Sequence, residues 1–383
     1  MVSIIGTGHS RFGRLPDSFE DLIVAVAHEA LDESGIAPAE IGGIWLGHFN
    51  AGMVDDGFAS SLAISAHPDL RWSPATRVEN ACASGAAAIR AATDAINSGR
   101  LRAALVIGAE KMTHLPTADA ATCLGRAANQ PEEAGQSFPA IFARFARAYA
   151  DRFGDPTEAM AQIAAKNHAN AMANPLAQMH KPLPVEFCRE VSDKNPMIAA
   201  PLKVSDCSLV SDGAAALVLV ADDLARGQDA VRIAAMEQVS DILPMSRRDL
   251  SVMEGPRRAI ATALAACGTG LDGIDFAEVH DCFTIAELMT YEAMGLAEPG
   301  QGARCLEDGT VMRGGALPVN LSGGLKAKGH PVGATGVSMH VLAARQLLGR
   351  AGEMQLTGAR RGLVFNMGSA AVANYASVLE GAA

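Results

Sequence analysis

Aromatic residues are scarce in this chain of 383 residues, at 4%, although hydrophobic residues make up 49% of it. Together with 38 glycines, this composition argues against a disordered chain and against a β-sandwich. It favours helices of small residues packed closely on a sheet. Positive charge is not in excess either, because the formal net charge is −11. Nothing therefore draws the chain as a whole to nucleic acid or to an anionic membrane.

The chain also lacks paired cysteines. The seven that it has are scattered, odd in number and without zinc-type spacing, at positions 82, 123, 188, 207, 267, 282 and 305. We therefore expect free thiols in a reducing compartment and no bound metal. We see no Walker-type loop, no charge-free apolar run long enough to cross a membrane, and no secretory or peroxisomal signal. These absences predict a cytoplasmic protein.

An internal repeat organises the chain. Residues 30–46 form the pattern of a helix, a glycine stop and a strand, and residues 263–279 repeat it. Each half then continues into a helix marked by glycine, at residues 85–98 and 333–348. Such alternation predicts largely parallel sheets with helices on their faces.

The repeat suggests two domains. We place the first at residues 1–240 and the second at 241–383. Within the first lies an inserted region, residues 115–201, with predicted helices at 138–153 and 157–173. A segment this long that crosses a compact domain is more often functional than idle.

The most informative stretch is Asn-Ala-Cys-Ala-Ser-Gly at residues 80–85, which sets the thiol of Cys82 among small residues. Such a cysteine can stand on a sharp strand-to-helix turn, where the N–H groups of the following helix favour a thiolate. That thiol attacks carbonyl carbons, and small neighbours let an acyl group approach. The alternative is a small apolar residue that fills a gap at a helix start, the commoner fate of a free cysteine.

Two motifs in the second half supply partners for this thiol. Residues 323–336 gather glycines around His330, whose imidazole can accept a proton from a thiol. Pro331 fixes φ directly after this histidine. His-Asp-Cys-Phe at residues 280–283 follows an apolar run. Titratable groups just beyond a strand end are what an active site on an α/β sheet needs.

Together these motifs resemble the thiolase superfamily, and within it the sterol-carrier-protein-type thiolases. Residues 80–88 resemble the nucleophile loop, and residues 329–336 the Gly-His-Pro-x-Gly-Ala-Thr-Gly signature. Residues 280–283 resemble the His-Asp-Cys-Phe motif, which replaces Asn-Glu-Ala-Phe in better-known branches. Residues 166–170 and 211–216 also resemble that group. The resemblance implies an α/β thiolase fold: two similar βαβαβαββ halves stacked as a five-layered α-β-α-β-α sandwich, with an inserted loop domain.

The resemblance also implies a reaction. A thiolase is an acyltransferase that makes or cleaves 3-ketoacyl-CoA through an acyl-cysteine, here on Cys82. His330 would be the base for the thiol, and the backbone N–H groups of Cys82 and Gly368 would form the oxyanion hole. His330 and His280 would provide a second pocket, for the enolate of acetyl-CoA. Coenzyme A and acyl-CoA would be substrates, with no cofactor bound permanently.

One position departs from the common pattern of the family. Most thiolases carry a second acid/base cysteine in a Cys-x-Gly stretch, but the matching stretch here begins with Asn366 and ends at Gly368. An amide cannot exchange protons near neutral pH. The resemblance implies that Cys282 takes over this role, and the alternative is a buried residue that only fills a gap.

Other residues are candidates for contacts with coenzyme A or the substrate. Phe283, Met253 and Gly255 suit a pantetheine channel, although a place in the core is an equally good interpretation. His168 resembles part of the family's loop segment, and Arg189 in the inserted region is a candidate for a phosphate contact. The last candidate for a substrate contact is Asn366.

Two other classes stay open. A ketosynthase-like condensing enzyme also starts from an acyl-cysteine; Asn366 is compatible with it, but Cys282 argues against it. A thiolase-like subunit would act as a retro-aldolase or acyltransferase only with a small OB-fold partner. Intact Cys82, Cys282 and His330 argue against an inactive subunit. The family implies a homodimer or a dimer of dimers, with no nucleic-acid or membrane partner.

Overall fold

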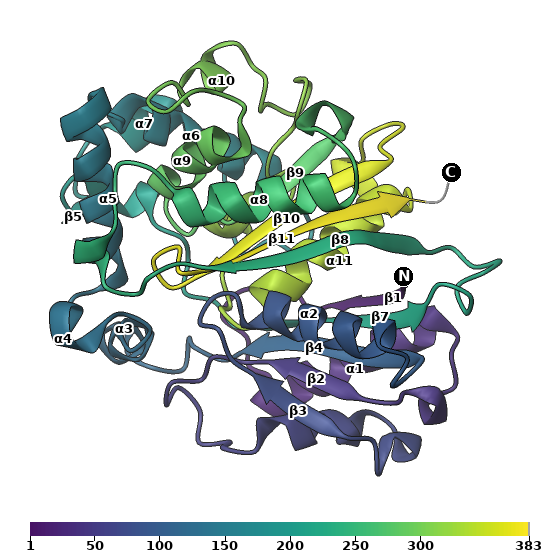
Figure 1. Cartoon of the computed structure of the whole chain (residues 1–383). Helices are drawn as coiled ribbons and strands as arrows, with labels where there is room; N and C mark the ends of the chain where they lie inside the picture. The colour runs from purple at the N-terminus through teal and green to yellow at the C-terminus, as the bar shows by residue number, and fades with distance from the viewer. Residues whose placement is uncertain (382–383) are drawn as a thin grey trace.

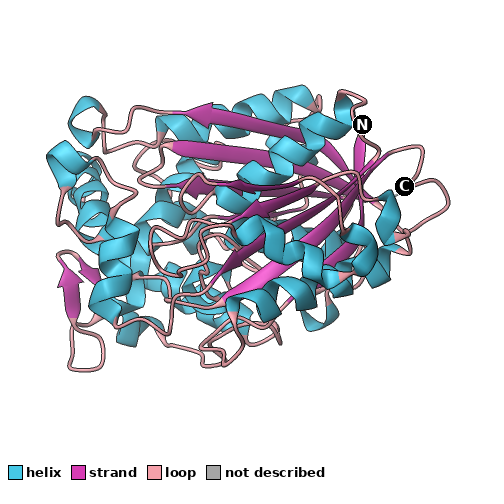
Figure 2. Ribbon diagram, turned by 90° about the horizontal axis from the view of Figure 1, so that it is seen from below, coloured by secondary structure: helices cyan, strands magenta, loops and turns pink. Residues whose placement is uncertain are grey.

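The computed structural model describes residues 1–381 and shows one large mixed sheet covered by helices (Figures 1 and 2). The strand order is β3-β2-β4-β7-β1-β8-β11-β10-β9. Strands of the first half therefore lie on one side of the order and strands of the second half on the other. Their bounds are β1 Val2–His9, β2 Ile44–Gly47, β3 Ala75–Val78, β4 Ala103–Glu110, β7 Gly213–Ala221, β8 Val231–Ser240, β9 Phe276–Val279, β10 Arg361–Gly368 and β11 Ala373–Gly381.

The two halves of the sheet are joined at their edges. β1 pairs with β8 in antiparallel fashion over three residues, from Val2 opposite Ile233 to Ile4 opposite Val231. Strands β2, β3 and β4 run parallel, as do β9 and β10, whereas β7 and β11 pair antiparallel with their neighbours. The sheet is therefore continuous, although its two halves pack in different layers.

Helices form the remaining layers. Helix α1 (Phe19–Ser34) packs on β1 and β7, and α8 (Glu254–Ala266) packs on β8 and β11. Between the halves lie α2 (Ser84–Asn97) and α11 (Thr335–Leu347), and α11 contacts both β7 and β10 (Figure 1). The expected five-layered α/β architecture is confirmed.

Glycines allow the segments of the central layer to pack closely against one another and against the sheet. A Cβ added at Gly85, in the first turn of α2, would lie 2.8 Å from the carbonyl oxygen of Gly333. A Cβ at Gly108 on β4 would lie 2.6 Å from the same oxygen. A side chain at Gly85 would push α2 away from α11, and one at Gly108 would push β4 away from it, because close-packed interiors leave no room for an added methyl group. The glycines of the two motifs thus fix the distance between the loops that carry Cys82 and His330.

The two halves are less alike than predicted. Between β2 and β3 the expected α-helix is a 3₁₀ helix, Ala59–Ala66. Within residues 1–381 there is no strand between α9 (Thr284–Met294) and α11; Val319 makes only an isolated parallel bridge with Ala277. The physical reason is that Asn320 has a φ of 56°, in the left-handed region, which turns the chain away from the sheet.

The inserted region is mostly helical. The predicted helix at 138–153 is found as α5 (Phe138–Phe153), and the predicted helix at 157–173 ends earlier, as α6 (Thr157–Ala171). Ser137 caps α5 by accepting a hydrogen bond from the N–H of Ala140 (3.4 Å), and Gly154 follows its end. The smaller elements here and in the second half are α3 Thr117–Gly125, α4 Gln130–Glu133, α7 Val185–Arg189, β5 Met197–Ala199, β6 Leu202–Lys203 and α10 Arg304–Glu307.

Among the helices within residues 1–381, none combines the length and the apolar character that are needed to cross a membrane.

Candidate active site

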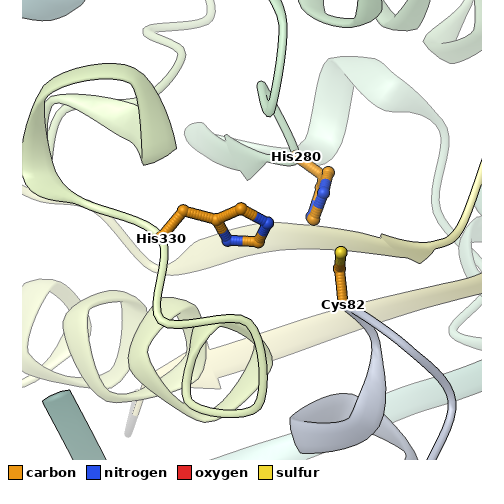
Figure 3. A group of neighbouring side chains, drawn as sticks. All are labelled: Cys82, His280 and His330. Carbon is orange, nitrogen blue, oxygen red and sulfur yellow. The ribbon is translucent and has the colours of Figure 1, made fainter. Parts of the chain in front are cut away.

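Three loops bring Cys82, His280 and His330 together at the centre of the molecule (Figure 3). Cys82 lies between β3 and α2, His280 directly follows β9, and His330 precedes α11. The Sγ atom of Cys82 and one ring nitrogen of each histidine all lie within 4.8 Å of one another, and all three residues are buried. Ala81 has a φ of 51°, so Cys82 follows a left-handed residue on a sharp turn, as predicted.

The hydrogen bonds of His330 leave it a proton acceptor. Its Nδ1 lies 2.7 Å from Oγ1 of Thr335, and that hydroxyl donates to the carbonyl oxygen of Pro331 (3.0 Å). The hydroxyl oxygen must therefore accept from Nδ1–H, which leaves the lone pair of Nε2 free. The backbone N–H of His330 donates to Oγ of Ser211 (2.9 Å) and fixes the loop. Neutral His330 is thus arranged as a base.

The hydrogen bonds of His280 give it the opposite tautomer. The amide nitrogen of Asn366 donates to the carbonyl oxygen of Cys82 (3.2 Å) and lies 2.8 Å from Nδ1 of His280. Because a carbonyl oxygen can only accept, this nitrogen is a donor, so Nδ1 accepts and Nε2 carries the proton. This buried Nε2–H has no hydrogen-bond partner among the described residues. His280 therefore offers a free donor at the site.

Burial keeps this site uncharged at rest. Burial, with the carboxylate of Glu110 as the second cause, raises the pKa of Cys82 to about 12. Burial and the nearby Lys328 ammonium lower the pKa of His330 to about 3, and burial holds the pKa of His280 well below its usual range. The expectation that the helix start favours a Cys82 thiolate is wrong for the resting site. Backbone N–H groups do lower this pKa, but desolvation outweighs them.

Alkylation of Cys82 by iodoacetamide should therefore accelerate about tenfold for each pH unit up to at least pH 10, because the thiolate is the reactive form. The raised pKa means that the folded protein disfavours the thiolate, so the rate is still rising where an ordinary cysteine, with a pKa of about 8.5, levels off. Peptide mass analysis after timed alkylation would follow Cys82 separately from the other thiols. A rate that levels off below pH 10 would contradict the raised pKa.

The predicted oxyanion hole, formed by the backbone N–H groups of Cys82 and Gly368, stays a prediction, and the residue after Gly368 lies close to the thiol. The N–H groups that interact with the Cys82 thiol are its own and that of Ser369, the residue after Gly368. A Cβ added at Gly368 would lie 2.1 Å from the carbonyl oxygen of Asn80. Gly368 therefore allows the two loops to touch and lets Ser369 reach the thiol.

The thiols of Cys82 and Cys282 face one cavity. Its volume is about 180 Å³, its floor is formed by buried residues that include both cysteines and His330, and it opens at exposed Thr117 and Val210. Of the described residues that line it, none is Asp, Glu, Lys or Arg. We refer to it as the apolar channel. Burial, followed by the influence of Cys82, raises the pKa of Cys282 well above its usual range, so Cys282 carries its proton.

Phe283 also lines the apolar channel and stacks on Phe142 of α5, with ring centroids 4.6 Å apart. The inserted region therefore covers the site, as the resemblance implies. Asp281 lies between His280 and Cys282 in the sequence, but it turns away from the channel. Its carboxylate accepts hydrogen bonds from the N–H groups of Leu325 (2.6 Å) and Lys326 (3.2 Å). It ties the His-Asp-Cys-Phe motif to the loop of His330.

The other predicted contacts lie elsewhere. Met253 and Gly255 line a separate cavity of about 330 Å³, together with Arg248. Arg189 is exposed and bonds to Glu158 (2.8 Å), and it lines neither cavity.

His168 is buried, with its Nδ1 3.0 Å from the carbonyl oxygen of Lys181, and it also lines neither cavity. Asn366 lies behind His280 rather than on the channel.

The sequence did not identify some residues of the candidate site. Thr335 and Ser211 lie inside recognised motifs, but the sequence does not show that their hydroxyls orient His330. A second group lies behind the site, where Lys166 is 2.9 Å from Glu287 of α9. The signal was Glu287 between the apolar residues Ala286 and Leu288, because a buried carboxylate needs a partner.

Comparisons with known proteins agree with this geometry. Residues 2–223 match the family description "Thiolase, N-terminal domain", and residues 237–381 match "Thiolase C-terminal domain-like". An acetyl-CoA acetyltransferase of Methanothermobacter thermautotrophicus is 37% identical over 373 residues, 96% of each chain. Sterol carrier protein 2 of Bos taurus is 30% identical over 96% of this chain and 70% of its own.

A solved structure, the Ltp2-ChsH2(DUF35) aldolase, has a TM-score of 0.83 over 99% of this chain and 97% of its own. At 21% identity this likeness supports the fold alone. The matches of both halves to thiolase domains, with relatives that cover nearly the whole chain, show that the chain belongs to the thiolase family.

Proposed function

We propose that this protein is a thiolase-type acyltransferase that forms or cleaves 3-ketoacyl-CoA through an acyl group on Cys82. The observation that carries the proposal is that Cys82 and Cys282, together with Cys207, line one apolar channel with a neutral histidine base between the loops. One thiol can carry the acyl group while the other moves a proton. Coenzyme A and its thioesters are the proposed substrates, as for the acetyltransferase relative by its name.

Cleavage begins at Cys82. His330 accepts the thiol proton on Nε2, and the thiolate sulfur bonds to the keto carbon of the substrate. We assign the backbone N–H groups of Cys82 and Gly368, which the thiolase resemblance implies, as the donors to the resulting oxyanion. When this tetrahedral intermediate collapses, the bond between the keto carbon and the α-carbon breaks. The acyl group stays on Cys82 and acetyl-CoA leaves as its enolate.

The enolate needs a donor and then a proton. The unpartnered Nε2–H of His280 is the donor that we assign to the enolate oxygen, and its tautomer is set by Asn366. Cys282, still protonated, gives its proton to the α-carbon. The Cys282 thiolate then accepts the proton of a second coenzyme A thiol, whose sulfur attacks the acyl group. The bond between Cys82 and the acyl carbon breaks, and the Cys82 thiolate takes its proton back from His330. In the reverse direction Cys282 removes the α-proton of acetyl-CoA.

Asn366 thus has a role although it cannot exchange protons. In place of an acid/base thiol it presents a fixed donor to Nδ1 of His280 and to the carbonyl oxygen of Cys82. Because Asn366 holds the donor tautomer of His280, the proton transfer must come from another group. Cys207 and Cys282 both line the channel beside Cys82, and we assign the role to Cys282, as the resemblance of its His-Asp-Cys-Phe motif implies.

Two partial reactions separate the roles of the thiols. Cys282→Ala should lower thiolysis of acetoacetyl-CoA by about 10²-fold or more, because general acid–base catalysis is lost. It should equally slow the exchange of α-hydrogens of acetyl-CoA with D₂O. Exchange of labelled coenzyme A into acetyl-CoA needs only acyl transfer to Cys82 and should persist.

Cys267→Ala is the matched control, since Cys267 at the end of α8 lies off the channel. If Cys282→Ala still exchanges α-hydrogens at the rate of the parent protein, the assignment of Cys282 fails. If the parent protein cleaves no 3-ketoacyl-CoA, the proposed function itself fails.

The oligomeric state of the protein and its cellular compartment remain predictions. The seven cysteines are free, as a reducing compartment such as the cytosol would keep them. A homodimer follows from the family resemblance, and a small partner protein is suggested by the name of the Ltp2-ChsH2(DUF35) aldolase. Size-exclusion chromatography with light scattering on protein from the native host would test both.

A further inference from the structure

The apolar channel lies between two separate hydrophobic clusters. On one side, Cys82 and Met112 are buried in a small cluster, and Leu124 of α3 packs against it. On the other side, Cys282 and Phe283 belong to the large core cluster that includes the second half of the sheet. All five residues line the channel. Each thiol therefore stands in an apolar wall of its own.

The proposed reaction divides the substrate between these two walls. When 3-ketoacyl-CoA is cleaved, the acyl group stays on Cys82, whereas the acetyl-CoA part takes its proton from Cys282. The bond that breaks thus lies between the two thiols. The acyl chain extends from the keto carbon on the side of Cys82, and the pantetheine arm belongs to the part that Cys282 protonates. The wall around Cys82 is therefore the one that the acyl chain contacts.

Helix α3 leads from this wall to the mouth of the channel. Thr117, Ala121 and Leu124 all line the channel, and their spacing places them on one face of the helix. Leu124 is partly buried against the cluster of Cys82, whereas Thr117 at the mouth is exposed. The stretch from Thr117 to Leu124 spans about 10 Å of helix, roughly the length of an extended chain of eight carbon atoms. We refer to these three residues as the α3 face.

The α3 face offers apolar contact without charge. Ala121 and Leu124 present only hydrocarbon groups to the channel, and of the described residues that line it none is Asp, Glu, Lys or Arg. Each methylene group that a ligand buries on such a surface strengthens binding by up to about fourfold. A carboxylate at the end of a short chain would lose its water without gaining a charged partner. The channel therefore favours an uncharged hydrocarbon chain.

We propose that the α3 face binds the acyl chain, and that the preferred substrates are 3-ketoacyl-CoA esters whose transferred acyl group is an unbranched hydrocarbon chain longer than acetyl. The proposal rests on the proposed function and names its substrate class. Leu124, nearest to Cys82, contacts the first methylene groups of the chain. Ala121 contacts the later ones, and its small side chain leaves the path to the mouth open.

The first test compares the thiolysis of four esters by the parent protein. Acetoacetyl-CoA, 3-ketohexanoyl-CoA and 3-ketodecanoyl-CoA leave two, four and eight carbon atoms on Cys82. Their kcat/KM values should rise along this series, by about 10-fold or more from the first to the last, because added methylene groups are buried. 3-Ketoadipyl-CoA has the chain length of 3-ketohexanoyl-CoA but ends in a carboxylate, and it should be cleaved with a lower kcat/KM.

Two variants test the α3 face itself. Ala121→Phe should lower the ratio of kcat/KM for 3-ketodecanoyl-CoA to that for acetoacetyl-CoA by about 10- to 100-fold, because the ring occupies the path of the longer chain. Leu124→Ala should lower the ratio of 3-ketohexanoyl-CoA to acetoacetyl-CoA by about two- to fivefold, since the first methylene groups lose a contact. The matched control is Ala118→Phe, which makes the same change on the same helix at an exposed position off the channel and should keep both ratios.

Circular dichroism would show whether each variant is folded, and Leu124→Ala decides the matter if Ala121→Phe does not fold. The proposal is overturned if the parent protein shows no preference for the longer esters, or if it prefers 3-ketoadipyl-CoA to 3-ketohexanoyl-CoA. It is also overturned if the α3 variants lower kcat/KM equally for every ester, because α3 would then contact the pantetheine arm. In all three cases the proposed function stands. A parent protein that cleaves none of the esters would refute the proposed function and this proposal with it.

Discussion

Replacement of Cys82 by alanine should abolish acyl transfer, with kcat lowered by about 10⁴-fold or more, as expected when a covalent nucleophile is removed. The change removes one sulfur atom from a buried site and leaves the backbone N–H groups of the oxyanion hole in place. We therefore expect the variant to fold. Incubation with radiolabelled acetyl-CoA, followed by gel filtration and intact mass measurement, should show one acetyl group on the parent protein and none on the variant.

The matched variant for this experiment is Cys282→Ala. It keeps Cys82, His330 and the oxyanion donors, so it should still take up the acetyl label. Acetyl label retained by Cys82→Ala would contradict the assignment of the nucleophile and direct attention to Cys282, which faces the same channel. Loss of label from both variants would mean that Cys282 also supports acyl transfer, against the proposed division of roles between the two thiols.

The sequence was sufficient for the parts of the site that lie in short motifs. Cys82, His280 and His330 each follow a pattern of small residues or a strand end, and such patterns report local backbone geometry. Gly333 illustrates why this worked, because a Cβ there would lie 2.5 Å from the carbonyl oxygen of Ala109 and 2.8 Å from that of Gly47. Where two backbones approach closely, only glycine fits, and such glycines can be recognised in the sequence without a structure.

Properties that depend on several distant segments could not be predicted in this way. The raised pKa of Cys82 results from burial by loops far apart in the chain, which overrides the local effect of the helix start. The opposite tautomers of His330 and His280 depend on Thr335 and Asn366, whose hydrogen bonds only the folded chain fixes. Likewise, Arg248 is an ordinary surface residue until the loop of Ala370 covers it. In each case tertiary contacts, not local preference, decide the chemistry.

Lys166→Met should destabilise the fold strongly without changing a residue that lines the channel. Nζ of Lys166 lies 2.9 Å from Oε1 of Glu287, and both side chains are at most 2% exposed. Asn167 donates to both Glu287 (2.6 Å) and Asp281 (2.8 Å), so the two carboxylates share one buried network. Removing the cation leaves Glu287 uncompensated beside Asp281. Breaking a buried pair in this way costs about 3–5 kcal/mol in the free energy of unfolding.

The pH dependence of this loss follows from Asp281. Burial, together with Glu287, raises the pKa of Asp281 to about 7. The folded state therefore holds this proton more tightly than the unfolded chain, where the pKa is about 3.9, so this contribution to stability is present at low pH and is lost as pH rises through about 7. Because protonated Asp281 does not repel Glu287, the destabilisation by Lys166→Met should be larger at pH 8 than at pH 5.5. Chemical denaturation at the two pH values, with exposed Lys194→Met as control, would measure it.

A second substitution decides whether the buried charge is the cause. Glu287→Gln added to Lys166→Met removes the uncompensated carboxylate but keeps an oxygen that can accept from Asn167 and Asn320. The double variant should recover most of the lost stability, since replacing both charges of a buried pair is often close to neutral. A double variant no more stable than Lys166→Met would show that packing of the lysine stem, rather than its charge, supports the network behind the active site.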